Sequence, residues 1–312
     1  MRTIPILFTF DENLTLAAGV CFTSLLENAF PDTFYDIFVL HSPACHFENT
    51  LLPRIADKYP NSRITFRVVE NEFQGAYETR GIPETAYYRL LAPELIPEYD
   101  KIIYSDVDVI FREDLGRYYD IDLKDYYFAG VDNGVRLRPD MQRYVSSLGL
   151  NPDEGYFYSG NLIINAAQQR KDQLGIRFRE AAKTDYYDQD MAIINLVCHG
   201  RILPLGPSFC LSNNLYNLIV NQKDQMVRYY GEEEIEHALA SGIVHYNGAK
   251  PWKKASMNMD IWWFYYRKSI FFNEKDCYDF WENETFLLER TSFVKRLKMV
   301  ARYPLDQKNK SL

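Results

Sequence analysis

The stretch KIIYSDVDVIF, residues 101–111, ends an apolar run with two carboxylates, Asp106 and Asp108. Side chains two residues apart on an extended chain point to the same side, so both anions can share one cation. Hard divalent cations such as Mg²⁺ and Mn²⁺ prefer oxygen ligands and often bind only one or two protein carboxylates. Because an isolated D-x-D motif also arises by chance at solvated strand ends, the rest of the chain must decide between these alternatives.

Runs typical of strands and helices alternate on both sides of this stretch. Strands are expected at residues 4–10, 35–41, 63–69, 101–106, 128–133, 160–165 and 243–252, and helices at 14–29, 47–59, 84–95, 174–184 and 189–200. This alternation predicts an α/β fold whose mostly parallel sheet is covered by helices on both faces. In such folds ligands bind at the carboxyl ends of the strands, where the D-x-D motif is expected.

Composition and charge narrow the class of protein. The chain has 312 residues, of which 47% are hydrophobic, and this content favours a folded protein over a disordered one. A net charge of −8 argues against a nucleic-acid-binding groove. The five cysteines are scattered, which favours free thiols over disulfides or a zinc site. Without a leader pattern or an apolar run of about 18 residues, a cytoplasmic protein is expected.

A second polar cluster lies in IVHYNGAKPW, residues 243–252. His245 ends an apolar strand, and its imidazole suits Mn²⁺ better than Mg²⁺, so it could complete a site of two carboxylates and one histidine. Gly248 permits close approach of the backbone, and Lys250 supplies a positive charge for a phosphate. A cation, a glycine and a lysine together predict a site for a diphosphate.

These motifs resemble those of glycosyltransferase family 8, a retaining, metal-dependent group that includes glycogenin and bacterial lipopolysaccharide α-galactosyl- and glucosyltransferases. The resemblance covers roughly residues 3–255. It implies a GT-A type catalytic domain, a single Rossmann-like nucleotide-sugar-binding unit, at residues 1–265, with an aromatic and basic helical extension at residues 266–312. The implied reaction moves a hexose from UDP-Glc or UDP-Gal to a saccharide or lipid-linked glycan, in the assembly of lipopolysaccharide or another cell-surface glycan.

The resemblance also implies roles for individual residues. YSDVDVIF and HYNGAKPW match the family's metal-binding blocks, so Asp106, Asp108 and His245 would bind Mn²⁺, with Mg²⁺ as the alternative. The implied donor-binding residues are Thr9, Asp11 and Asn13 in LFTFDENL, Arg89 in AYYRLLAPEL, Asp106 and Val107 in the D-x-D block, Tyr158 and Ser159 in GYFYSGNLIIN, and Gly248 and Lys250. Catalytic or acceptor-orienting roles fall on Asp188 and Gln189 in YYDQDMAIIN and on Asp132 in GVDN.

Two positions depart from the family's pattern. Tyr158 and Ser159 stand where the family usually has Asn-Ala or Asn-Ser, so the identity of the donor sugar does not follow from the resemblance. The spacing between Gly248 and Lys250 is one residue shorter than usual. The position matching the reaction centre, Gln189, is an amide and hence a poor nucleophile. Attack by the acceptor on the face from which the diphosphate departs is therefore favoured over a double displacement.

Several alternatives remain open at this stage. An apolar strand followed by D-x-D-V also resembles the nucleophile loop of haloacid-dehalogenase-type phosphatases, in which Asp106 would be phosphorylated. A nucleotide-sugar-binding module without turnover is a further alternative. Individual residues also have plain structural readings: Arg89 could pair with Glu84, and residues 188–190 could cap a helix, since acids stabilise helix N-termini.

The C-terminal tail is basic, with seven Lys and Arg residues against one acid in residues 290–312. On a helical projection of residues 290–302, one face is apolar and is formed by Phe293, Val294, Leu297, Val300 and Ala301. A basic amphipathic helix is typical of segments that lie on an anionic membrane surface, which predicts a peripheral position on the inner face of the membrane. The alternative is that the apolar face packs against the catalytic domain.

Overall fold

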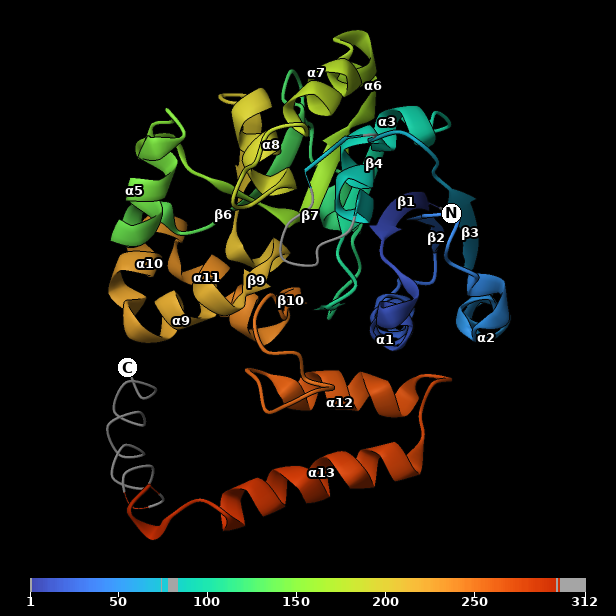
Figure 1. Cartoon of the computed structure of the whole chain (residues 1–312), viewed down its shortest axis with the longest axis vertical. Helices are drawn as coiled ribbons and strands as arrows, with labels where there is room; N and C mark the ends of the chain where they lie inside the picture. Colours follow the sequence, from blue (N-terminus) through green and yellow to red (C-terminus); the bar gives the residue numbers. More distant parts are fainter. Residues whose placement is uncertain (1, 74, 78–83, 296, 298–312) are drawn as a thin grey trace.

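A seven-stranded mixed sheet forms the centre of the protein (Figure 1). The structure is a computed structural model, and it describes residues 2–73, 75–77, 84–295 and 297. The strand order is β3-β2-β1-β4-β7-β6-β8, with β7 antiparallel to both of its neighbours and the other pairs parallel. The strands are β1 (Arg2–Thr9), β2 (Thr33–His41), β3 (Ser62–Val68), β4 (Lys101–Ser105), β6 (Phe128–Asp132), β7 (Phe157–Asn165) and β8 (Ile202–Leu205). The predicted mixed, mostly parallel α/β architecture is confirmed.

A second sheet of three short strands lies at the carboxyl end of β4. It has the order β5-β10-β9 and consists of β5 (Val109–Ile110), β9 (Leu211–Ser212) and β10 (Val244–His245). Strand β10 runs antiparallel to β5 and parallel to β9. Because β5 begins directly after the D-x-D motif, this small sheet connects the motif to segments from the second half of the chain.

Helices cover both faces of the central sheet (Figure 1). The α-helices are α1 (Thr15–Glu27), α2 (Ile55–Lys58), α3 (Ala92–Leu95), α4 (Gly116–Tyr119), α5 (Pro139–Ser147), α6 (Ala166–Lys171), α7 (Leu174–Ala181), α8 (Asp190–Val197), α9 (Asn213–Asn221), α10 (Lys223–Tyr230), α11 (Glu232–Ala240), α12 (Met259–Lys268) and α13 (Glu274–Glu289). Successive residues of β1 point to opposite faces: Phe8 packs in one core with Phe22 of α1, whereas Leu7 packs in another with Leu91 and Ile193. Burial on both faces explains why the strands read as continuous apolar runs.

Short 3₁₀ helices complete the fold and correct two expectations. They are η1 (Glu12–Leu14), η2 (Phe47–Asn49), η3 (Leu52–Arg54), η4 (Glu84–Leu91), η5 (Val135–Leu137), η6 (Pro152–Glu154) and η7 (Pro207–Phe209). The helix expected at residues 47–59 is wrong as one element, because η2, η3 and α2 replace it. The helix expected at residues 84–95 consists of η4 and α3. Pro53 and Pro93 lie at the starts of η3 and α3, where a residue without an N–H interrupts a continuous helix.

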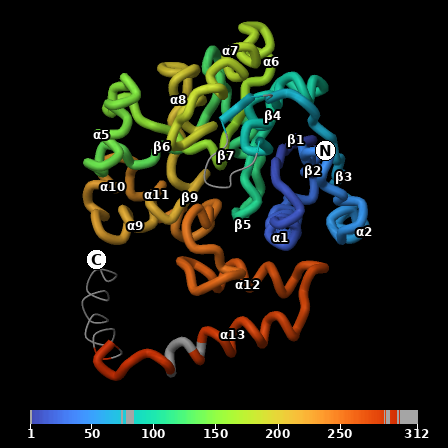
Figure 2. Tube along the Cα trace, viewed as in Figure 1, coloured from blue at the N-terminus to red at the C-terminus, as the bar shows by residue number. Residues whose placement is uncertain are grey.

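Helices α12 and α13 form a separate layer below the small sheet (Figure 2). In α12, Trp262 and Tyr266 are buried with Val20 of α1 and with Ile110 and Tyr246 of the small-sheet region. The domain boundary expected near residue 265 falls inside α12, and the division into two domains stays a prediction. The strand expected at residues 243–252 is ordered as a strand only at Val244–His245. Among the described residues, no helix is both long and apolar enough to cross a membrane.

Candidate functional site

The register of the small sheet brings together residues that are far apart in the sequence. Asp106 and Asp108 occupy the turn between β4 and β5, and β5 pairs with β10 so that Val109 lies opposite His245. The ladder continues beyond this pair, because the Tyr246 N–H donates to the carbonyl of Asp108 at 2.8 Å. The backbone hydrogen bonds of two-residue strands therefore set the position of His245 relative to the D-x-D motif.

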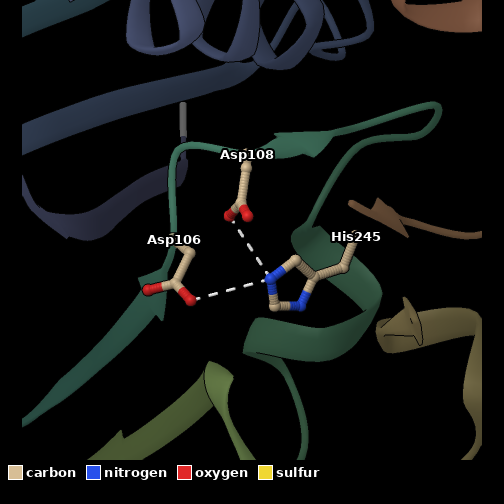
Figure 3. A group of neighbouring side chains, drawn as sticks. All are labelled: Asp106, Asp108 and His245. Carbon is tan, nitrogen blue, oxygen red and sulfur yellow. Dashed lines mark ion pairs between the residues drawn. The ribbon is translucent and has the colours of Figure 1, made fainter. Parts of the chain in front are cut away.

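Asp106, Asp108 and His245 form a compact group of metal-ligating side chains (Figure 3). One ligand atom from each lies within 4.8 Å of the others. The Nε2 atom of His245 is 3.6 Å from Asp106 Oδ2 and 3.3 Å from Asp108 Oδ1. The side chains are 27%, 14% and 5% exposed in the order Asp106, Asp108, His245. Two carboxylates and an imidazole form a donor set that fits a divalent cation.

Asp106 is held by two side chains from neighbouring elements. The hydroxyl of Tyr104 donates to Asp106 Oδ1 at 2.5 Å and lies 3.2 Å from the hydroxyl of Thr9. An Nη1 atom of Arg89 lies 3.1 Å from the same carboxylate oxygen, and its guanidinium stacks 4.3 Å from the centre of the Tyr104 ring. Arg89 also pairs with Asp190 at 3.4 Å. Its ion pairs among the described residues therefore link the D-x-D motif to the start of α8.

Asp108 is held by Lys250, whose ammonium donates to Asp108 Oδ2 and, at 2.7 Å, to the carbonyl of Tyr246. Burial alone would raise the pKa of Asp108, but the positive charges of His245 and Lys250 outweigh this effect and hold it below its usual range. Asp108 is therefore an anion over the whole physiological pH range.

His245 lies in a confined space. Its Nδ1 atom is 3.5 Å from the Sγ atom of Cys210, which is fully buried. A Cβ atom at Gly160 would lie 2.4 Å from Cε1 of His245 and 2.7 Å from Oδ2 of Asp106, so only glycine fits there. Burial lowers the pKa of His245, but the carboxylate of Asp108 outweighs burial and raises the pKa well above its ordinary value. Without a cation, the imidazole is protonated and supplies positive charge to the two partly buried carboxylates.

Two adjoining pockets open beside this group. The first, of about 210 Å³, is lined by Thr9, Phe10, Asp11, Leu14, Thr85, Ala86, Arg89, Asp106, Val107, Asp108 and Lys250. The second, of about 470 Å³, is lined by Asp11, Glu12, Asn13, Ser42, Ala44, Cys45, Glu84, Thr85 and Tyr88. Asp11 and Thr85 line both pockets, so the two pockets are adjacent near the carboxyl end of β1. Six of the residues predicted to bind the donor line the first pocket, and Asn13 lines the second.

Gln189 occupies an unusual position at the N-terminus of α8. Its backbone has a φ of +44°, and its side chain is 1% exposed. Neither its amide nitrogen nor its amide oxygen has a hydrogen-bond partner among the described residues. A buried amide without partners costs free energy, and strained backbone of this kind is concentrated at functional sites. The neighbouring Asp190 has a raised pKa, because burial outweighs the opposing charge of Arg89.

Other predicted residues have contacts that lie outside the pocket. Both carboxylate oxygens of Asp132 accept backbone hydrogen bonds, from Val135 at 3.1 Å and from Tyr156 at 2.8 Å. The hydroxyl of Tyr156 donates to Asp188 at 3.4 Å. Asp132 and Asp188 are thus both hydrogen-bonded to Tyr156, the residue that precedes β7.

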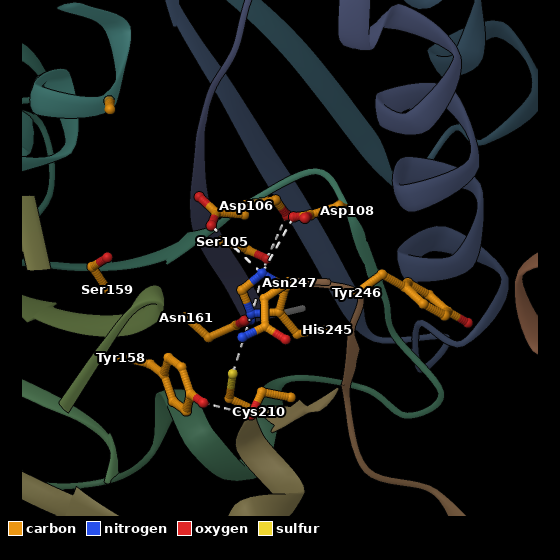
Figure 4. Close-up of polar contacts among 12 residues, drawn as sticks. Ser105, Asp106, Asp108, Tyr158, Ser159, Asn161, Cys210, His245, Tyr246 and Asn247 are labelled. Atoms are coloured by element: carbon orange, nitrogen blue, oxygen red, sulfur yellow. Dashed lines mark hydrogen bonds and ion pairs between the residues drawn. The ribbon is translucent and has the colours of Figure 1, made fainter. Parts of the chain in front are cut away.

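Tyr158 and Ser159 sit at the start of β7 and differ in environment (Figure 4). The hydroxyl of Tyr158 is buried and accepts from Ser212 Oγ at 2.9 Å and from Asn214 Nδ2 at 3.2 Å. The carbonyl of Ser159 accepts from Arg89 at 2.9 Å. At Gly248, a Cβ atom would lie 2.4 Å from Nδ2 of Asn213, so the close approach that this glycine permits is to α9.

Three residues of the site were missed by reasoning from the sequence. Tyr104 lies two residues before Asp106, so the two-residue period of a strand could have placed both side chains on one side. Gly160 interrupts an apolar strand, which is a known sign of close approach by another group. Cys210 carries no local signal, because its contact with His245 exists only through the pairing of β9 with β10.

Comparisons with known proteins point to one family of enzymes. The family model described as glycosyl transferase family 8 matches residues 5–256. The lipopolysaccharide 1,2-glucosyltransferase of Escherichia coli is 25% identical over 264 residues, which is 80% of this chain and 74% of that protein. A putative glycosyltransferase of Haemophilus influenzae is 24% identical over 311 residues, covering 95% of this chain and 88% of that protein.

Solved structures share the fold. The galactosyltransferase LgtC, solved with donor and acceptor sugar analogues, superposes with a TM-score of 0.71 at 24% identity, over 87% of this chain and 98% of that chain. The bifunctional glycosyltransferase WbbM superposes with a TM-score of 0.70 at 22% identity, over 89% of this chain. The superposition covers 51% of the WbbM chain, so this protein spans about half its length.

We expect Gly160→Ala to abolish cation binding while preserving the fold. The added methyl group would collide with His245 and Asp106, whereas the strand conformation itself accepts alanine. Titration calorimetry with Mn²⁺ and circular dichroism measure the two effects. Gly130→Ala is the matched control, because Gly130 lies in the neighbouring strand β6 and faces Leu162. Mn²⁺ affinity equal to that of the wild type in Gly160→Ala would contradict the geometry described.

We expect Mn²⁺ binding to release a proton from His245. The raised pKa means that the cation must displace this proton, since only neutral imidazole is a ligand. Affinity should increase with pH, by up to about tenfold per pH unit, until the pKa of the metal-free imidazole is passed. Calorimetry in two buffers of different ionisation enthalpy counts the protons. An enthalpy that does not depend on the buffer would refute this expectation.

Proposed function

This chain belongs to glycosyl transferase family 8, and we propose that it transfers a hexose from UDP-Glc or UDP-Gal to a saccharide acceptor with retention of configuration. The observation that carries the proposal is the convergence of Asp106, Asp108 and His245 beside a pocket that also holds Arg89 and Lys250. A role in the assembly of lipopolysaccharide or another cell-surface glycan is supported by the likeness to the E. coli lipopolysaccharide 1,2-glucosyltransferase.

The nucleotide part of the donor would occupy the two adjacent pockets. Asp11 lines both of them, and its carboxylate and the side chain of Asn13 can meet the hydroxyl groups of a ribose and the polar edge of a base. Asp11 already accepts a hydrogen bond from the N–H of Asn13 at 2.9 Å, which fixes its orientation. Thr9 and Val107 line the first of the two pockets, together with the D-x-D motif.

The diphosphate would lie next to Asp106, Asp108 and His245, which would hold Mn²⁺, with Mg²⁺ as the alternative. A bound divalent cation stabilises the negative charge that develops on a departing diphosphate. Lys250 supports the same charge: its ammonium contacts Asp108 in the chain without donor, and it can turn to a phosphate once Asp108 has another cation. Charges fixed in place before the reaction act without reorganisation, so they lower the barrier strongly.

The sugar would face Arg89, Ser159 and the start of α8. Gln189 is the group that we propose to stabilise the sugar as it gains oxocarbenium character, because its buried amide has no other partner in the described chain. The acceptor hydroxyl would attack from the face that the diphosphate leaves, and a diphosphate oxygen would accept its proton. A solved structure of LgtC is described as an active-site mutant in which a glutamine is replaced by glutamate.

The remaining predicted residues receive supporting roles in this proposal. Asp188 would orient the acceptor from the loop before α8. Asp132 would act through the backbone of residues 135 and 156, since its carboxylate oxygens are already engaged there. Tyr158 would influence the choice of donor sugar by fixing Asn214 through their hydrogen bond.

The phosphatase alternative is not favoured. Its nucleophile would be Asp106, but in this chain one oxygen of that carboxylate is paired with Arg89 and Tyr104. The alternative also gives no role to His245, and it conflicts with the family to which the chain belongs. The non-catalytic alternative does not explain why the buried amide of Gln189 has no hydrogen-bond partner among the described residues. A hydrolysis assay with UDP-Glc and UDP-Gal tests this alternative directly.

We expect UDP to bind tightly with Mn²⁺ and weakly in the presence of a chelator. Asp108→Asn and His245→Ala should each abolish the difference, because each removes one of three cation ligands. Calorimetry with UDP measures both affinities. The matched control is His237→Ala, since His237 pairs with Glu113 away from the site. If UDP binds equally well with and without the cation, the proposed metal dependence is wrong.

The C-terminal tail would attach the enzyme to an anionic membrane surface. Phe293, Val294 and Leu297 are 76%, 63% and 57% exposed, so the described part of the apolar stripe does not pack on the catalytic domain. Val300, Ala301 and the basic residues Arg296, Lys298, Arg302, Lys308 and Lys310 lie outside the described residues. Basic residues beside such a surface add about 1 kcal/mol of attraction each.

We expect a chain truncated after Glu289 to lose its binding to anionic vesicles while it keeps donor hydrolysis. Sedimentation with vesicles that contain or lack an anionic lipid measures the binding, and UDP release measures the hydrolysis. An insoluble and inactive truncated chain would show instead that the stripe belongs to the core.

A further inference from the structure

Asp106 and His245 each have two polar side-chain atoms. In each residue one of these atoms faces the other candidate ligands, and the second atom contacts a buried side chain outside the group. For Asp106, the held atom is Oδ1, which accepts the hydroxyl hydrogen of Tyr104 at 2.5 Å. The free atom is Oδ2, which lies 3.6 Å from Nε2 of His245. Tyr104 is itself fixed, because its hydroxyl contacts Thr9 at 3.2 Å and its ring is completely buried. These contacts hold Oδ1 and leave Oδ2 as the oxygen that faces His245.

For His245, the held atom is Nδ1, which lies 3.5 Å from Sγ of Cys210. Figure 4 shows Cys210 on one side of the imidazole and the two aspartates on the other. A histidine that binds a metal through Nε2 keeps its proton on Nδ1, so in the loaded site the imidazole would donate to the sulfur. Cys210 directly precedes β9, which pairs with β10, so the backbone ladder fixes the distance between the two side chains.

Tyr104 and Cys210 differ from the other groups that touch these ligands. Arg89 and Lys250 line the donor pocket and can contact the donor directly, whereas Tyr104 and Cys210 are fully buried and do not line it. The Tyr104 ring also stacks against Arg89, but the Tyr104 hydroxyl contacts Asp106 and the Cys210 sulfur contacts His245, so these two groups can act on the cation through its ligands.

We propose that Tyr104 and Cys210 are positioning residues of the cation site, which fix the rotation of Asp106 and of the His245 ring so that Oδ2 and Nε2 converge. This inference rests on the proposed function only in its premise that a divalent cation binds there. Loss of such an outer partner typically weakens metal binding by about 10- to 100-fold.

The test measures Mn²⁺ affinity of the full chain by calorimetry, without donor or turnover. Tyr104→Phe removes one hydroxyl and keeps the ring, and Cys210→Ala removes the sulfur. Each should weaken Mn²⁺ binding by about tenfold or more. Cys210→Ser, which keeps a polar acceptor, should lie between Cys210→Ala and the wild type.

Two control variants make the same chemical changes away from the cation site. Tyr127→Phe removes a hydroxyl that donates to Asp172 at 2.8 Å, and Cys198→Ala removes a buried thiol at the end of α8. Both controls should keep the Mn²⁺ affinity within about twofold of the wild type, even where the melting temperature falls. Tyr104 acts on Asp106 and Cys210 on His245, so either variant decides the matter if the other does not fold.

The possible results separate this inference from the proposed function. Mn²⁺ affinities of Tyr104→Phe and Cys210→Ala that equal those of the controls would overturn the positioning roles and leave the cation site intact. An affinity of Cys210→Ser no better than that of Cys210→Ala would overturn the hydrogen-bonding role of the sulfur. A wild-type chain that binds no Mn²⁺ would overturn the proposed cation site itself.

Discussion

Two neighbouring carboxylates in a mostly buried place can exist only if positive charge lies against them. Removing one member of a buried ion pair leaves an uncompensated charge, which costs several kcal/mol. Here Arg89 pairs with Asp106, Lys250 pairs with Asp108, and a protonated His245 faces both. The three cationic groups come from η4, from the loop after β10 and from β10 itself, so the need to compensate the D-x-D motif ties distant parts of the chain together.

The small sheet brings the charged side chains of Asp108 and His245 together with few residues. It contributes two residues from each of three strands, yet it fixes the backbone of Asp108, Cys210 and His245 through one register. Side chains carried on such a ladder are placed more accurately than side chains on free loops. The central sheet positions the other residues near Asp106. Strand β4 carries Tyr104, and the antiparallel β7 places Gly160 next to Asp106, whose N–H donates to the Gly160 carbonyl.

The sequence was informative where chemistry is concentrated in short local patterns. Apolar runs buried on both faces predicted the strands, and the motifs around Asp106 and His245 singled out the three candidate cation ligands that the structure brings together. The ion-pair partners of Arg89 could not be assigned from the sequence, since its pairing with Asp106 and Asp190 instead of Glu84 depends on how η4 packs. The broken helix at residues 47–59 was missed because apolar periodicity outweighed the signal of Pro53. Cys210 could not be found in this way, since its contact with His245 depends on the pairing of two strands that are distant in the sequence.

The aromatic cluster of α12 packs against Tyr246, the residue next to His245 in the chain. Tyr246 follows His245 directly, and its ring is buried with Trp262 while its hydroxyl donates to the carbonyl of Asn258 at 2.7 Å. A shift of α12 must therefore move the backbone that carries His245. Coupling between two sites is reciprocal by thermodynamic necessity. If the packing of α12 raises the cation affinity by some factor, a bound cation must favour the packing of α12 by the same factor. The C-terminal layer is in this sense linked to the proposed cation site, although none of its described side chains lines the pocket.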